Sequence, residues 1–209
     1  MVSHPMILLF YRISAFFNTM MGIFHKKTTE NNYFINKSYI PSPDDPLIED
    51  QDGKAGLRYG SKTFAHSGCA AAAVYNALRI LGDPVPLADI IRHFEGHGAA
   101  FFAALGTAPQ AAVKYFSGLG YYPIRTSNRR KFRELAENSD VMIFTIMNDR
   151  RSIRRMLHTM CVEHNNACFT VHNSHGRAET YPNYDEMMAN LGDGGGKADG
   201  VYLVGIRKC

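Results

Sequence analysis

Residues 59–81 read YGSKTFAHSGCAAAAVYNALRIL, and the interpretation of the whole chain starts from this stretch. Small and polar residues lead to Ser67 and Gly68, which suit the entry to a helix, and four alanines follow directly after Cys69. Cys69 therefore lies in the first turn of a predicted helix. The unpaired N–H groups of that turn stabilise an anion, so we expect a lowered pKa for the Cys69 thiol. A buried core cysteine is the alternative, because free cysteine is among the most buried residue types.

The composition indicates one globular domain with a short extension. The chain has 209 residues, of which 45% are hydrophobic and 20% charged, and a formal net charge of +4. Two basic clusters, at 129–133 and 150–155, are more typical of solvated surface than of a nucleic-acid site, since no aromatic motif accompanies them. The four cysteines do not form a disulfide framework. We therefore expect a cytoplasmic protein with reduced thiols and no nucleic-acid partner.

The chain divides into three predicted parts. Residues 1–27 form an apolar helix, and its core at 6–24 approaches the length of a membrane span. Two interpretations stay open for it: a helix packed on the domain, or a helix in peripheral contact with a membrane. Residues 28–56 are rich in turn formers and predict a linker, and 57–209 form the compact domain.

Helix signals dominate the first half of the domain and strand signals the second, which predicts an α+β fold. Helices are predicted over 69–81, 87–95 and 108–119, with short ones over 128–137 and 182–191. Strands are predicted over 121–126, 141–147, 157–163, 167–172 and 201–206.

The strands around residues 157–172 predict a hairpin whose turn is Asn165-Asn166. Counting outward from this turn places His158 directly opposite Asn173, at the end of an apolar face that we expect to point to the core. An Asn beside a His can orient the imidazole, which then serves a thiol as base. His172 is the rival base, because a one-residue slip of the hairpin would exchange the two faces.

A zinc site is the competing interpretation of the same hairpin. Cys161, His164, Cys168 and His172 have the residue types of a ligand set. In the predicted register His164 points to the other face, and Cys168 and His172 are about 13 Å apart along one strand. We therefore expect no metal and no organic cofactor.

The combination of Gly68-Cys69 at a helix start with a His-led strand and a later Asn resembles the papain-like cysteine peptidase superfamily. Within it the chain resembles compact bacterial peptidases of the bacteriocin-processing, double-glycine-leader type. The resemblance covers about residues 57–208 and implies a papain-like fold, with a helical N-terminal half packed on an antiparallel sheet. It implies thiol-dependent hydrolysis of a peptide or amide bond in a peptide or protein substrate. Cys69 would attack, His158 would transfer the proton, and Asn173 would orient His158.

One departure from the family pattern concerns the oxyanion hole. Many members have a Gln several residues before the Cys, whereas this chain has Ser61, Lys62 and Thr63 there. These three are the candidates to assist the Cys69 N–H. Loss of one oxyanion donor lowers rates by about a hundredfold or more. A weak or inactive binding or immunity-type module on the same fold, or an amide or acyl transferase, therefore remains an alternative to the hydrolase.

Overall fold

The computed structural model describes residues 4–39, 46–148, 157–165, 168–174, 176–192 and 196–208. A helical N-terminal half precedes an antiparallel sheet, which confirms the predicted α+β class. The helices are α1 (His4–Met20), α2 (Gly22–Asn36), α3 (Phe64–Ser67), α4 (Cys69–Leu81), α5 (Leu87–His97), α6 (Ala111–Gly118), α7 (Phe132–Glu137) and α8 (Tyr184–Asn190), with 3-10 turns η1 (Asp52–Lys54) and η2 (Arg129–Lys131). The strands are β1 (Arg58–Tyr59), β2 (Lys62–Thr63), β3 (Ile124–Thr126), β4 (Val141–Met147), β5 (Leu157–Asn165), β6 (Cys168–Ser174), β7 (Arg177–Tyr181) and β8 (Asp199–Ile206).

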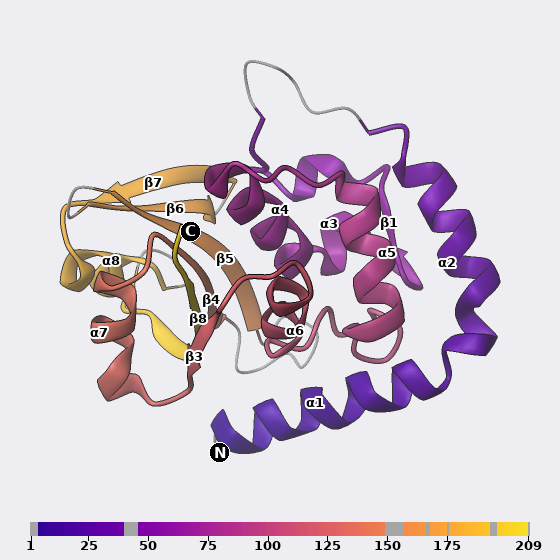
Figure 1. Ribbon diagram of the computed structural model, residues 1–209, viewed down its shortest axis with the longest axis horizontal. Coiled ribbons are helices and arrows are strands. Elements are labelled where there is room, and N and C mark those ends of the chain that lie inside the picture. The colour runs from indigo at the N-terminus through magenta and orange to yellow at the C-terminus, as the bar shows by residue number, and fades with distance from the viewer. Residues whose placement is uncertain are drawn as a thin grey trace.

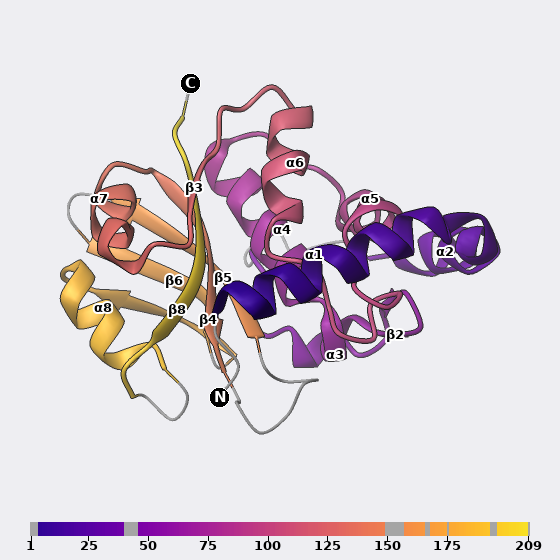
Figure 2. The ribbon, with the colours of Figure 1, turned by 90° about the horizontal axis from the view of Figure 1, so that it is seen from below.

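The main sheet has six strands in the order β3-β8-β4-β5-β6-β7, and each neighbouring pair is antiparallel. Helices cover both faces of this sheet. Figures 1 and 2 show α4, α5, α6 and α1 on one side and α7 with α8 on the other. Each side has its own hydrophobic core. Strand β4 is consequently buried at all seven positions, as expected for a strand covered on both faces.

Helix α4 forms as the sequence predicts, from Cys69 to Leu81. It ends where Gly82 adopts a left-handed conformation with φ of 91°, which glycine tolerates without strain. Ala71, Ala72 and Ala73 are completely buried. Their small side chains let the helix backbone approach the sheet closely.

Asn76, also on α4, holds an extended segment against the helix. Its side-chain oxygen accepts the Ile48 N–H at 2.8 Å, and its amide donates to the Ile48 carbonyl at 2.9 Å. Both residues are fully buried. Because the two bonds satisfy both main-chain groups of Ile48, they fix the path of the chain through residues 46–52.

The N-terminal segment differs from the predicted helix followed by a linker. The first helix ends at Met20, the chain bends by 94°, and α2 continues to Asn36, well inside the predicted linker of 28–56. Buried amides tie both helices to the domain: Asn18 bonds to the Glu95 carbonyl at 2.9 Å, and Asn32 to the Glu95 carboxylate at 2.7 Å. These tertiary contacts stabilise a helix whose polar residues, taken alone, are typical of turns.

The hairpin of β5 and β6 has a different register from the predicted one. Asn165 lies opposite Cys168, so the pairing is shifted by two residues, and His172 lies opposite Cys161. A shift of two keeps every side chain on its face. However, Met160 and its neighbours on the apolar face contact α7 and α8, whereas Cys161 packs toward α4. The predicted apolar face does point to a hydrophobic core, but the face that was predicted to be polar is buried as well, against α4.

We predict that Asn76→Ala destabilises the protein by about 2 kcal/mol or more, since it leaves two buried main-chain groups of Ile48 without partners. Urea denaturation followed by circular dichroism measures the change. Asn190→Ala, on the exposed end of α8, is the matched control and should change the free energy of unfolding by less than about 0.5 kcal/mol. Equal urea midpoints for the two variants would contradict the role given to Asn76.

A second prediction concerns the N-terminal helices. Deleting residues 1–39 removes the core side chains of α1 and leaves the buried carboxylate of Glu95 without its Asn32 partner. We expect the shortened chain to unfold at clearly lower urea concentration than the full chain, or to be insoluble. An unchanged urea midpoint would restore the interpretation of 57–209 as an independent domain.

Candidate functional site

Cys69 is the first residue of α4 and is half-buried. The chain reaches it through the short helix α3, whose first turn is capped by Thr63. Between the two helices Gly68 passes very close to Phe64: an added Cβ would lie 2.4 Å from the Phe64 ring. Only glycine fits this approach, which places the thiol at the helix N-terminus as the sequence predicts.

His158 lies at the second residue of β5, before pairing with β6 begins. Its imidazole lies close enough to the Cys69 thiol for each group to shift the pKa of the other. Burial alone raises the pKa of Cys69, but His158, by hydrogen bond and charge, together with the N–H groups of Thr159 and Ala70, outweighs burial and lowers that pKa. Burial also opposes the charged imidazole, yet Cys69, the Asn173 carbonyl and the Asp52 charge raise the pKa of His158. The two shifts together favour a thiolate–imidazolium pair.

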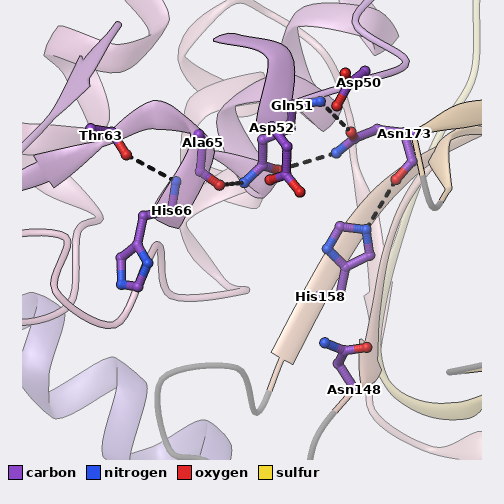
Figure 3. A pocket seen from close by; sticks show the side chains of 10 residues that line it. Asp50, Gln51, Asp52, Thr63, Ala65, His66, Asn148, His158 and Asn173 are labelled. Atoms are coloured by element: carbon purple, nitrogen blue, oxygen red, sulfur yellow. Dashed lines mark hydrogen bonds between the residues drawn. The ribbon is translucent and has the colours of Figure 1, made fainter. Parts of the chain in front are cut away.

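Asn173 contacts His158 through its main chain. The Nε2–H of His158 donates to the Asn173 carbonyl at 3.0 Å (Figure 3). This bond leaves Nδ1 available for the thiol. The pairing of β6 with β7 is irregular between Val171 and Ser174, and within this irregularity Asn173 has a φ of 62°. Asn tolerates this left-handed conformation better than most residues. The bulge thus turns a carbonyl toward the imidazole, a contact that the predicted pairing of side chains did not include.

The side chain of Asn173 is bound to the segment that Asn76 holds. Its Oδ1 accepts the Gln51 N–H at 3.1 Å, and its amide donates to the Gln51 side chain at 3.2 Å. The Asn173 N–H donates to Glu49 at 2.9 Å, and the other Glu49 oxygen accepts from His172 at 2.6 Å. Glu49 and Gln51 therefore fix the bulge that orients His158.

Sequence reasoning missed Glu49 and Gln51 because both fall in the predicted linker. The apolar pair Leu47-Ile48 just before them was the available signal, since Ile48 is fully buried. An isolated pair is too short to show periodicity, and the partner that holds it, Asn76, lies 28 residues away.

A cavity of about 800 Å³ opens beside His158. One wall comes from residues 50–66, and the other from the ends of the strands that hold His158 and Asn173 (Figure 3). The described lining is mainly polar and contains two carboxylates and no Lys or Arg. The lining residues are Asp50, Gln51, Asp52, Thr63, Ala65, His66, Asn148, His158, Asn173 and Gly176.

The three oxyanion candidates lie in different settings. Thr63 lines the cavity, but its hydroxyl accepts the His66 N–H as the cap of α3. The Ser61 hydroxyl bonds to the Phe102 carbonyl, and Lys62 is not among the lining residues. Of the three, only Thr63 is positioned beside the cavity.

The residues of the zinc interpretation do not converge. Cys161 and His172 are cross-strand partners, but His172 bonds to Glu49. His164 stacks on Phe169, which belongs to the other core. Among the described residues, no group of three His, Cys, Asp or Glu side chains could hold a metal ion.

No protein-family model matches the sequence, and no curated protein matches it. Among solved structures, the chain is similar to the peptidase domain of Streptococcus ComA, a bifunctional ABC transporter involved in a quorum-sensing pathway. The identity is 12% and the TM-score 0.46, over 68% of this chain and 91% of the ComA domain. The neighbour is a peptidase domain.

Proposed function

We propose that the protein is a cysteine peptidase-like hydrolase that cleaves a peptide or amide bond. The observation that supports this most is the pairing of Cys69 with His158, each of which shifts the pKa of the other, with Nε2 of His158 held by the Asn173 carbonyl at 3.0 Å. A nucleophile, a base and a group that orients the base are the parts that this chemistry requires. The cavity beside His158 has room for a peptide segment.

In the proposed reaction the Cys69 thiolate attacks the carbonyl carbon of the scissile bond. The main-chain N–H of Cys69, at the start of α4, is the donor for the oxyanion that forms. His158 gives its proton to the leaving amine as the tetrahedral intermediate collapses to a thioester. It then takes a proton from water, whose oxygen attacks the thioester and releases the acid and the Cys69 thiolate beside the imidazolium.

The pKa shifts give the proposed activity a bell-shaped pH dependence. The lowered pKa of Cys69 places the acidic limb below the usual range of a free thiol, because the thiolate forms earlier. The raised pKa of His158 moves the alkaline limb upward, because the imidazolium keeps its proton longer. The two limbs belong to the coupled pair rather than to either residue alone.

Alkylation of Cys69 by iodoacetamide, resolved by site with mass spectrometry and measured against pH, tests the pair. We expect labelling of Cys69 to stay fast at roughly pH 6–7, below the free-thiol pKa of about 8.5. His158→Ala should move this profile to higher pH, and Cys69→Ser should abolish hydrolysis. Buried Cys161, whose pKa is raised well above its usual value, is an internal reference that should react slowly.

The control for His158→Ala is His97→Ala, which replaces an exposed histidine on α5. His172 is unsuitable, because its bond to Glu49 would be lost. A Cys69 profile at or above the free-thiol range, unchanged by His158→Ala, would contradict the proposal. The chain would then be a binding module with a cysteine at a helix start.

Two substitutions at Asn173 separate its main-chain role from its side-chain role. Glycine keeps the left-handed conformation, whereas alanine opposes it by about 1–2 kcal/mol, and both lose the amide bonded to Gln51. If the carbonyl orients His158, Asn173→Gly should keep the low-pH labelling of Cys69 better than Asn173→Ala. Equal loss in both variants would instead assign the orienting role to the amide.

A further inference from the structure

Helix α1 has two apolar faces. Ile7, Leu8, Tyr11 and Ala15 are buried on one of them and belong to the core beneath α4 and α5. The opposite face is exposed. Its large residues follow helical spacing: Met6, Leu9, Phe10, Ile13, Phe16, Phe17 and Met20. Met21 and, beyond the bend, Phe24 are exposed as well.

This exposed apolar stripe is extensive for a globular surface. Exposure of the side chains runs from 44% at Phe10 to 75% at Phe24, and Phe101 beside Phe10 is 57% exposed. A surface helix ordinarily has a polar outer face, and a helix that is apolar all round is ordinarily buried on all sides. Contiguous exposed apolar residues of this kind mark a site of interaction with a partner or a membrane.

The charges next to the stripe indicate which partner fits. Residues 1–29 contain no Asp or Glu, whereas Arg12, Lys26 and Lys27 are exposed around the stripe. The first acidic residue, Glu30, is paired with Arg92. An apolar face whose own segment carries cations and no carboxylate complements a lipid surface with anionic headgroups, whereas apolar association of two protein surfaces needs no such excess of cations.

We propose that α1 docks the protein on an anionic lipid bilayer, with the helix lying in the interface and the exposed stripe among the acyl chains. No helix within the described residues is long and apolar enough by itself to cross a membrane. The buried face of α1 stays on the protein core, and Asn18 stays bonded to Glu95 and Phe102. The helix therefore presents the stripe without leaving the domain.

The docking helix is close to the proposed active site. Burial raises the pKa of Tyr11, on the inner face of α1, to about 12, and the nearby charge of Cys69 adds to the rise. Figure 2 shows α1 running along the outside of the helical half of the molecule. Docking by α1 would hold the Cys69–His158 pair at the membrane surface. The docking itself does not depend on the proposed hydrolysis.

The chain contains no Trp, so Phe17→Trp creates a single fluorescent reporter on the stripe. We expect its emission to move to shorter wavelength when the full chain is mixed with phosphatidylcholine vesicles containing one-third phosphatidylglycerol. Tyr122→Trp, at a residue 90% exposed outside α1, is the matched control and should not shift. Binding should weaken as salt is raised, since the cations contribute to it.

Phe16→Glu combined with Phe17→Glu should lower vesicle binding, measured by co-sedimentation, by at least about tenfold. The reason is that two aromatic side chains that would be buried among the acyl chains are lost. Circular dichroism checks that this variant remains folded, as expected for exposed positions. Absence of a shift at Phe17→Trp, or binding that survives the double substitution, would overturn the proposal. So would a dimer in sedimentation velocity that the double variant disrupts without any vesicle binding, since the stripe would then pair with a second copy.

Discussion

The two hydrogen bonds between Asn76 and Ile48 are the constraint on which the site depends. Helix α4 holds the thiol at its first residue and Asn76 two turns later. Asn76 fixes Ile48, the next residue Glu49 fixes the main chain of Asn173, and the Asn173 carbonyl holds His158 against the thiol. These hydrogen bonds therefore connect Asn76 on α4 to His158, which in turn lies beside Cys69 on the same helix. This arrangement restricts the Cys69 and His158 side chains more than any single bond in it could.

Burial and pairing have opposite effects on the charged forms of Cys69 and His158. Desolvation by itself would keep Cys69 and His158 neutral, because both charged forms lose the stabilisation of water. The mutual hydrogen bond, the main-chain donors at Cys69 and the main-chain acceptor at His158 together exceed that penalty. Removing one partner therefore does more than delete a contact: it leaves the other group buried and uncompensated. The left-handed conformation of Asn173 is likewise unfavourable by itself. It persists because the hydrogen bonds of Asn173 to Glu49 and Gln51 hold it.

Sequence patterns close to Cys69 and His158 were enough to identify these two residues as neighbours in space. The residues that hold them in place depend on contacts between distant parts of the sequence. Cys69 was identifiable because a helix start is encoded by its neighbours, and His158 because it begins a strand. The register of the hairpin was predicted two residues away from the observed pairing, because it was counted from an assumed turn at Asn165-Asn166, and Asn166 lies outside the described residues. The burial of its second face was missed because apolar alternation cannot distinguish one buried face from two. Glu49 and Gln51 were invisible because their positions depend on Asn76 and Asn173, far away in the sequence.

The same distinction explains why the first 39 residues were taken for an appendage. Their polar residues include four asparagines, and three of those amides, from Asn18, Asn32 and Asn36, bond to main-chain groups of the domain. Bonds of this kind fix orientation as well as position, because donor and acceptor must both align. Helix α1 cannot roll to bury its exposed stripe without breaking the Asn18 bonds at Glu95 and Phe102. A surface that binds this stripe must therefore accept the orientation that the protein gives it. Because the same bonds fix α1 to the domain, the cavity beside His158 has a constant orientation relative to anything bound at the stripe.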